Sequence, residues 1–236
     1  MKTAAVKTLA IDTSLAAGSV AALSDGRIAA RPLPTAGEHA RRLAAALAEV
    51  AAEIGWRPRD AEMIAVVRGP GSFTSLRVGV STAKAIAWTT GARLLGVSGF
   101  EVIARQAARF VGPGSMPVEI AYDAGRGEVF AATATPDAAS PSAWSVGPAT
   151  LLAAGDWIAS RPQGAVVSGP ALDLLAEACA ARADLWVVPG PFRAPSAGEA
   201  AAVAALRAAA GEADAPHSLL PDYLRPSYAQ ENDPRS

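Results

Sequence analysis

The residues best placed for chemistry stand between Gly69 and Gly79, in the segment G-P-G-S-F-T-S-L-R-V-G. This segment follows an apolar run, Met63 to Val67, that predicts a strand, and it opens a helix predicted from about Ser72 to Thr90. Glycines ahead of a helix N-terminus let the backbone approach an anion, and the free N–H groups there attract negative charge. Strand, glycine-rich turn and helix together indicate a phosphate site.

A phosphate site of the Walker type is not supported by these residues. That motif needs Gly-Lys followed by Ser or Thr, which is absent here, and Lys84 lies well inside the predicted helix. The alternative is a purely structural, tight strand-to-helix turn. Ser72 would then be the N-cap, and its hydroxyl would accept a hydrogen bond from an unpaired N–H of the first turn. Both interpretations stay open from this segment alone.

Two aspartates, Asp12 and Asp123, each stand where a predicted strand enters a turn. In a two-lobed α/β protein such carboxylates could face each other across a cleft and hold Mg²⁺ with a nucleotide phosphate. The alternative is that each caps nearby backbone N–H groups, as Asp in turns routinely does. The candidates for a vestigial phosphate loop are therefore Asp12, Thr13, Ser14 and Asp123.

Other catalytic centres find little support in the sequence. His39 and His217 are the only histidines, and no H-x-x-x-H or H-E-x-x-H pair puts two ligands on one helix face. Ser72 has no assignable histidine partner, and G-x-S-x-G does not occur at an expected strand-to-helix elbow. We therefore expect no metal site and no catalytic residue on this chain.

Composition narrows the partners and the compartment. The 21 Lys and Arg residues against 22 Asp and Glu give a net charge of −1, and no basic cluster exceeds short pairs such as Arg41–Arg42, which argues against tight RNA binding by this chain alone. The single cysteine, Cys179, fits a reducing compartment. No apolar run reaches the roughly 18 residues of a membrane span. Because Asp12 interrupts the apolar start, we expect a strand hairpin rather than a signal peptide, and a cytoplasmic protein.

The elements that must position these residues form a first lobe over residues 1–111. Three strands joined by short turns come first, and a helix follows in which Leu43, Leu47, Val50 and Ile54 form one apolar stripe. The expected elements are strands at Thr8–Thr13, Ser19–Leu23 and Arg27–Leu33, helix Glu38–Gly55, strand Met63–Val67, helix Ser72–Thr90, strand Arg93–Val97 and helix Gly99–Phe110. This order predicts an α/β lobe with a mixed sheet.

A second lobe, residues 112–236, is expected after the Gly- and Pro-rich linker Val111–Pro117. It opens with a strand-turn-strand that echoes the first hairpin and suggests duplication. The expected elements are strands Val118–Asp123 and Glu128–Thr133, a loop at Pro136–Ser142, strand Ala165–Ser168, helix Ala171–Ala181, strand Leu185–Val188, helix Ser196–Ala210 and an extended tail at Pro221–Tyr228.

Small residues form a stripe on each of the two long helices of the first lobe. Gly79, Ala83 and Ala87 recur at intervals of four, and the preceding helix carries a second stripe at Ala40, Ala44, Ala48 and Ala51. Such stripes let another helix pack closely. That helix could belong to the same lobe, or the stripes could contribute to a helical bundle shared with a partner chain.

Six short motifs along most of the chain point to one protein family. They are L-A-I-D-T-S with the following S-V-A, E-H-A-R at Glu38–Arg41, the segment Gly69–Gly79, G-V-S at Gly96–Ser98, D-A-G-R-G-E-V-F at Asp123–Phe130, and D-Y-L-R at Asp222–Arg225. With them the chain resembles the TsaB (YeaZ) family, the smaller paralogue of TsaD in the bacterial machinery for threonylcarbamoyladenosine in tRNA. Ser75 stands where the family usually has Gly, and Pro136 to Ala215 carries little motif identity.

This resemblance implies an α/β fold of two RNase H-like lobes, as in the actin-like ATPases, with mixed sheets flanked by helices. It also implies a non-catalytic subunit, a pseudoenzyme that has lost what TsaD keeps. TsaD binds its metal through an H-x-x-x-H motif, and only His39 stands in the corresponding stretch here. ATP and metal are accordingly expected on the partner subunits, with no cofactor on this chain.

The same resemblance implies the partners. TsaB pairs with TsaD through two N-lobe helices in a four-helix bundle, here residues 38–55 and 72–90. The pair recruits TsaE, binds tRNA and supports threonylcarbamoyl transfer to adenosine 37, and without TsaD a homodimer is expected. The corresponding interface candidates are His39, Leu43, Leu47, Ser72, Phe73, Leu76, Arg77, Val80, Ala83 and Ala87.

A different class of function remains as the alternative. A free-standing actin-fold ATPase or sugar-kinase-like phosphotransferase would use Asp12 and Asp123 for its metal and phosphate. An older interpretation of the family as glycopeptidases has no catalytic support in these residues.

Overall fold

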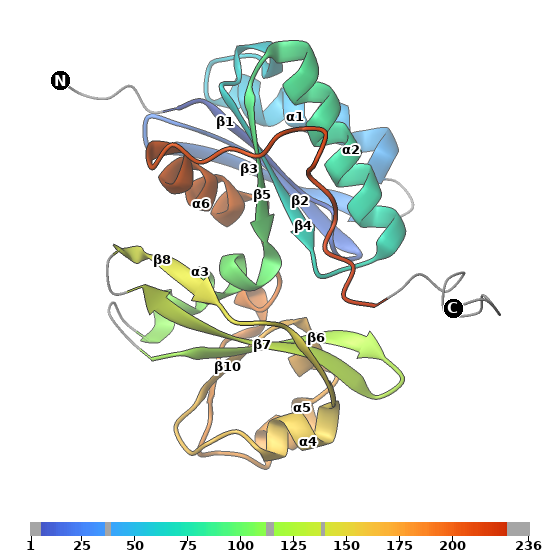
Figure 1. The fold of residues 1–236 in the computed structure, drawn as a ribbon, viewed down its shortest axis with the longest axis vertical. Helices are drawn as coiled ribbons and strands as arrows, with labels where there is room; N and C mark the ends of the chain where they lie inside the picture. Colours follow the sequence, from blue (N-terminus) through green and yellow to red (C-terminus); the bar gives the residue numbers. More distant parts are fainter. Residues whose placement is uncertain (1–5, 36–38, 112–115, 138–139, 226–236) are drawn as a thin grey trace. The chain divides into compact units, whose positions relative to one another are not determined.

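The computed structural model describes residues 6–35, 39–111, 116–137 and 140–225, and these form a mixed α/β protein of two compact units. The first unit combines Met1–Gly99 with Ser196–Ser236, and the second is Phe100–Pro195 (Figure 1). No helix in the described part of the chain is long and apolar enough to cross a membrane.

The first unit is built on a five-stranded mixed sheet in the order β3-β2-β1-β4-β5. Its strands are β1 (Thr8–Asp12), β2 (Ala17–Ser24), β3 (Arg27–Thr35), β4 (Met63–Gly69) and β5 (Arg93–Ser98). β1, β2 and β3 pair antiparallel, whereas β4 lies parallel to β1 and β5 parallel to β4. Asp25 and Gly26, both at positive φ, make the tight turn between β2 and β3 that the sequence predicts.

Helices cover both faces of this sheet. α1 (His39–Glu53) and α2 (Phe73–Thr90) lie on one face and α6 (Ala197–Ala209) on the other (Figure 1). Alternate residues of the strands, such as Leu9 and Ile11, share one apolar cluster with Leu43 and Leu47 of α1 and with Val80 of α2. The core therefore lies between the sheet and the inward faces of α1 and α2.

The second unit holds a six-stranded sheet in the order β11-β10-β6-β7-β8, with β9 paired to β7. The strands are β6 (Val118–Gly125), β7 (Glu128–Asp137), β8 (Ser140–Val146), β9 (Thr150–Ala153), β10 (Val166–Ser168) and β11 (Trp186–Val187). The helices are α3 (Gly99–Val111), α4 (Ala154–Ala159) and α5 (Ala176–Ala180), with short 3-10 turns at Pro170–Asp173 and Gly190–Phe192. In both sheets the first strand pairs antiparallel with the next and parallel with a later one.

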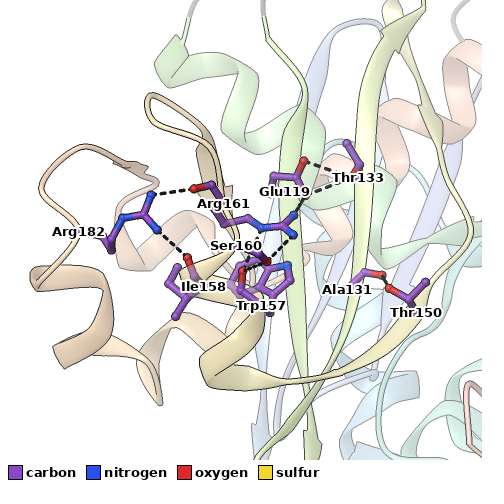
Figure 2. Close-up of polar contacts among 9 residues, drawn as sticks. All are labelled: Glu119, Ala131, Thr133, Thr150, Trp157, Ile158, Ser160, Arg161 and Arg182. Atoms are coloured by element: carbon purple, nitrogen blue, oxygen red, sulfur yellow. Dashed lines mark hydrogen bonds and ion pairs between the residues drawn. The ribbon is translucent and has the colours of Figure 1, made fainter.

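Two arginines secure the end of α4 in the second unit (Figure 2). Arg182 donates hydrogen bonds to the carbonyls of Ile158, Ala159 and Arg161 at 3.0, 3.1 and 2.8 Å. Arg161 forms an ion pair with Glu119 of β6 and donates to the Trp157 carbonyl at 3.0 Å. Because the last carbonyls of a helix lack intrahelical partners, these contacts satisfy them and hold α4 beside the sheet.

The prediction of a loop at Pro136–Ser142 is wrong, because the described residues of this segment belong to two strands. β7 continues to Asp137 and β8 begins at Ser140, and residues 138–139 between them lie outside the described part. The segment is rich in Ala, Ser and Pro, so its composition indicated a loop, but pairing with a neighbouring strand outweighs local propensity. The predicted helix Ala171–Ala181 is likewise divided into a 3-10 turn at Pro170–Asp173 and α5.

The division of the chain differs from the boundary expected at residues 111–112. α3 belongs to the second unit, and the final helix α6 with the tail belongs to the first. α6 returns because its apolar face, including Ala200, Val203 and Ala204, is buried against the first sheet. The Ala197 N–H also donates to Ser19 Oγ at 2.9 Å. Residues 112–115 of the expected linker lie outside the described part.

The small stripe on α2 packs inward. Ala83 is 0% exposed and Ala87 3%, and both belong to the apolar cluster of the first unit. A Cβ at Gly79 would lie 2.4 Å from Thr13 Oγ1, so glycine there permits close contact with the loop after β1. Of the two explanations of this stripe, packing within the lobe is therefore the correct one.

A substitution on this helix distinguishes its two faces. Ala83→Leu should lower the free energy of unfolding by about 1–3 kcal/mol, because a fully buried site has no room for the added carbons. Ala85→Leu, on the exposed side of the same helix, is the matched control and should change it by less than about 0.5 kcal/mol. Urea denaturation measures both, and equal effects would contradict the orientation of α2.

Candidate functional site

The glycine-rich turn between β4 and α2 is filled by the chain's own backbone. A Cβ at Gly71 would lie 2.1 Å from the carbonyl oxygen of Ser14, and the Ser72 N–H donates to that same oxygen at 2.9 Å. At Gly69, where φ is +144°, a Cβ would meet the Asp222 carbonyl at 2.8 Å. Ser72 is the N-cap of α2 as predicted, but its side chain makes no capping hydrogen bond. The glycines thus accommodate the neighbouring backbone in front of the helix.

The loop after β1 is locked onto α2. Asp12 Oδ1 accepts hydrogen bonds from the Ser14 N–H at 2.9 Å and the Ser14 hydroxyl at 2.7 Å, and the Thr13 hydroxyl donates to the Ser75 carbonyl at 2.7 Å. Asp12, Thr13 and Ser14 are all buried. Asp12 Oδ2 is buried without a hydrogen-bond partner among the described residues, and burial raises the pKa of this carboxyl from 3.8 to about 6.

The second aspartate makes a similar local contact. Asp123 Oδ1 accepts a hydrogen bond from the Gly125 N–H at 2.7 Å, and its side chain is exposed. Both aspartates therefore cap nearby N–H groups, as the plain alternative predicts, and they belong to different units. Within the described ranges, no group of three or more His, Cys, Asp and Glu side chains is placed to hold a metal ion.

An open groove of about 470 Å³ lies on the outward side of α2, next to the start of α1. Its lining is small or apolar except for one cation, and consists of Ala40, Phe73, Thr74, Arg77, Val78, Ser81 and Thr82. Further along the outward face of α2, Trp88 is 82% exposed. The groove and this exposed tryptophan thus lie on the same helix, and tryptophan is among the residues enriched at protein–protein interfaces.

The predicted interface residues divide between the two faces of the helices. Phe73 and Arg77 line the groove, and Ser72 is exposed. Six others, Leu43, Leu47, Leu76, Val80, Ala83 and Ala87, are buried in the first unit itself and are core residues. His39 is the first residue of α1, and its side chain lies outside the described part, as does Glu38.

The groove residues that sequence reasoning missed stand on the opposite side of α2 from the alanine stripe. Thr74, Val78, Ser81 and Thr82 follow each other at offsets of four, seven and eight, a pattern that was visible but mixed in polarity. On α1, Ala40, Ala44 and Ala48 are exposed as a partner-facing stripe requires, whereas Ala51 is buried.

The tail runs back to this site without forming a helix, as expected for the part up to residue 225. The Asp222 N–H donates to the Arg68 carbonyl at 2.7 Å, and the Asp222 carboxylate pairs with Arg68 Nε at 3.0 Å. The Tyr223 ring packs on Phe73 with centroids 4.5 Å apart, and its hydroxyl accepts a hydrogen bond from Arg77 Nε at 3.1 Å. The tail thereby contacts two residues of the groove.

The first prediction from this geometry concerns Gly71. Gly71→Ala should lower the free energy of unfolding by about 3 kcal/mol, because the new methyl group collides with the backbone of Ser14 rather than with a movable side chain. Gly155→Ala, where a Cβ meets nothing within 4 Å, is the control and should be neutral or slightly stabilising. Denaturant unfolding followed by circular dichroism reports both, and a neutral Gly71→Ala would disprove the close contact.

The second prediction concerns Asp12 and pH. Because the folded-state pKa is raised, this group favours the folded state most below about pH 3.8, and that stabilisation is lost as pH rises to about 6. A shift from 3.8 to about 6 corresponds to on the order of 3 kcal/mol. Asp12→Asn removes the titration, so its stability relative to the parent should increase between about pH 4 and pH 7. Urea titrations across this range measure it, and a constant difference would refute the assignment.

Part of the chain is similar in sequence to known proteins of tRNA modification. A model of the family "TsaD: tRNA N6-adenosine threonylcarbamoyltransferase" matches residues 30–141. The tRNA threonylcarbamoyladenosine biosynthesis protein TsaB of Escherichia coli K12 is 35% identical over 125 residues, 53% of each chain. The protein of the same name from Bacillus subtilis 168 is 33% identical over 123 residues, 52% of each chain. The matched segments thus span about half the length of these relatives.

A solved structure extends the similarity to nearly the whole chain. YeaZ from Pseudomonas aeruginosa superimposes with a TM-score of 0.75 at 25% identity, covering 93% of this chain and 100% of that one. The two mixed sheets flanked by helices accordingly fit the two-lobed, actin-like fold that the motifs imply. Motifs, sequence similarity and fold agree, and together they support the TsaB (YeaZ) family for this chain.

Proposed function

We propose that this chain is a non-catalytic scaffold subunit in the biosynthesis of threonylcarbamoyladenosine in tRNA. In this proposal it pairs with a TsaD-type transferase through the outward faces of α1 and α2. TsaE joins the pair, tRNA is bound only by the complex, and ATP and metal reside on the partner subunits. The observation that carries the proposal is the groove of small residues on α2, the helix that also carries the exposed Trp88, in a chain similar to TsaB proteins.

The groove suits a helix as its occupant. Ala40, Ser81 and Thr82 have short side chains, so a partner backbone can approach closely, while Phe73 and Val78 offer apolar surface. Tryptophan is among the residues that most often dominate binding energy once buried at an interface. Covering Trp88 is therefore expected to contribute a large share of the affinity.

A paralogous partner is favoured by the family relationship. The family model that matches residues 30–141 is that of the transferase, and the matched range contains both α1 and α2. A partner with an equivalent helix pair could pack that pair against α1 and α2 of this chain. The four helices together would form a bundle. The same surface would support a homodimer when the transferase is absent.

The contacts around the glycine-rich turn support a scaffold more than an ATPase. The Ser14 carbonyl oxygen occupies the space in front of Gly71 and accepts a hydrogen bond from the Ser72 N–H. The chain's own backbone therefore already contacts this helix start, where a phosphate would otherwise bind. Asp12 and Asp123 each accept a hydrogen bond from a nearby N–H group. Among the described residues, no contact therefore specifically favours the phosphotransferase alternative.

Reconstitution tests the proposal directly. The purified chain should form a stable complex with the TsaD-type transferase of the same organism in size-exclusion chromatography, and threonylcarbamoylation of tRNA should depend on it. By itself the chain should hydrolyse ATP negligibly. Absence of a complex under every nucleotide condition, or full tRNA modification without this chain, would reject the proposal.

A surface substitution locates the docking face. Ser81→Arg places a long charged side chain in the groove and should weaken the complex by about tenfold or more, since burying an unpaired charge at an interface is costly. Ala209→Arg, exposed on α6 at the other face of the sheet, is the control and should leave affinity unchanged. Isothermal calorimetry gives the affinities, and unfolding curves should show both variants as stable as the parent.

A further inference from the structure

Arg77 is held in a fixed orientation at the edge of the groove. Its guanidinium carbon lies 4.1 Å from the centroid of the Phe73 ring, a cation–π contact. Its Nε donates to the Tyr223 hydroxyl at 3.1 Å. The Tyr223 ring in turn packs on Phe73 at 4.5 Å. Two rings, one from α2 and one from the tail, thus fix a side chain that would otherwise be mobile in solvent.

The remaining donors of this guanidinium are available. Arg77 is exposed, and among the described residues no group accepts a hydrogen bond from its two Nη nitrogens. A planar guanidinium with both Nη groups free offers two parallel N–H donors, the geometry that matches a carboxylate or a phosphate. Prior fixation lowers the entropy lost when such an anion binds.

We propose that Arg77 is the receptor for a carboxylate of the docking partner. This inference rests on the proposed function: the occupant is a helix of the partner subunit that lays small residues in the groove. That helix carries an Asp or Glu side chain where the groove ends at Arg77. Arg77 thereby adds charge specificity to a surface that is otherwise small and apolar.

Charge favours a protein carboxylate over a nucleic-acid phosphate. Arg77 is the one charged residue among those described as lining the groove, and the others are Ala, Phe, Val, Thr and Ser. A surface that grips nucleic acid usually presents several cations along a track, and the chain as a whole has a net charge of −1. A lone cation beside an apolar groove suits one acidic side chain on a packed helix.

Tyr223 is a positioning residue for this receptor. The neighbouring Asp222 ties the tail to Arg68 through a backbone hydrogen bond of 2.7 Å and an ion pair of 3.0 Å. The tail cannot shift toward Gly69 either, because the Asp222 carbonyl already lies close to that glycine. The motif D-Y-L-R thus acquires a role, since its first two residues hold the aromatic ring that orients Arg77.

The experiment measures affinity for the TsaD-type transferase by calorimetry. Arg77→Met keeps the apolar part of the side chain and should weaken binding by about tenfold. The affinity of this variant should also depend less on salt concentration than that of the parent. Arg77→Lys should recover little of this loss, because lysine lacks the planar pair of donors. Arg27→Met, on an exposed arginine beside the β2–β3 turn and not among the groove residues, is the control and should bind like the parent.

A mutant cycle tests the part played by the tail. Tyr223→Ala should weaken binding in the parent chain but cause no further loss in the Arg77→Met background, because both changes remove the same contact. Tyr223→Phe keeps the ring and should lie between parent and Tyr223→Ala. A purely structural role of Tyr223 would instead give additive losses in affinity together with lowered thermal stability, and would overturn the positioning role.

The possible results distinguish a failure of the carboxylate-receptor inference from a failure of the proposed scaffold function. If the parent chain forms no complex, the proposed function fails. If the parent binds and Arg77→Met binds equally well, the carboxylate receptor alone is refuted. If Arg77→Met leaves pairing intact but weakens tRNA retention by the complex, Arg77 contacts phosphate instead and the inference is overturned. Restored binding between Arg77→Glu and a partner variant with an acidic residue changed to Arg would establish the pair.

Discussion

The close contact between the Ser14 carbonyl and Gly71 is the constraint on which the first unit depends. A Cβ at this position would lie 2.1 Å from the oxygen, so only glycine allows the loop after β1 to lie against the start of α2. The Ser72 N–H donates to the same oxygen, and the Thr13 hydroxyl binds the Ser75 carbonyl one turn later. This contact sets the position and rotation of α2 relative to the sheet.

The rotation of α2 decides which residues face a partner. Thr13 lies against Gly79 on the side of α2 that faces the sheet. The small-residue stripe that continues from Gly79 through Ala83 and Ala87 is therefore buried in the core. The opposite side, with Ser81 and Trp88, is left outward. The same glycine-rich segment that resembles a phosphate loop thus serves packing on its inner side, and through Phe73 and Arg77 it contributes to the groove on its outer side.

The C-terminal segment completes this arrangement from far along the chain. Asp214 accepts a hydrogen bond from the Gly96 N–H at 2.7 Å, and Leu219, 3% exposed, packs where a Cβ at Gly96 would collide. Asp222 then reaches Gly69 and Arg68. Gly69 at the end of β4 and Gly96 within β5 therefore make room for the returning tail, and this return explains why the last forty or so residues join the first unit.

The motifs in the sequence pointed to the TsaB (YeaZ) family. The sequence by itself also determined the α/β class and most elements of the first unit, because periodic apolar residues and the turn at Asp25–Gly26 are local signals. Of the interface candidates that the resemblance implied, Phe73 and Arg77 line the groove. Only the tertiary structure decided which side of α2 is buried, that Pro136 and Asp137 belong to a strand, and that α6 packs on the first sheet. The reason is physical: rotation of a helix, strand pairing and the return of a distant segment depend on contacts between residues far apart in sequence, such as Ser14 with Gly71 and Tyr223 with Arg77.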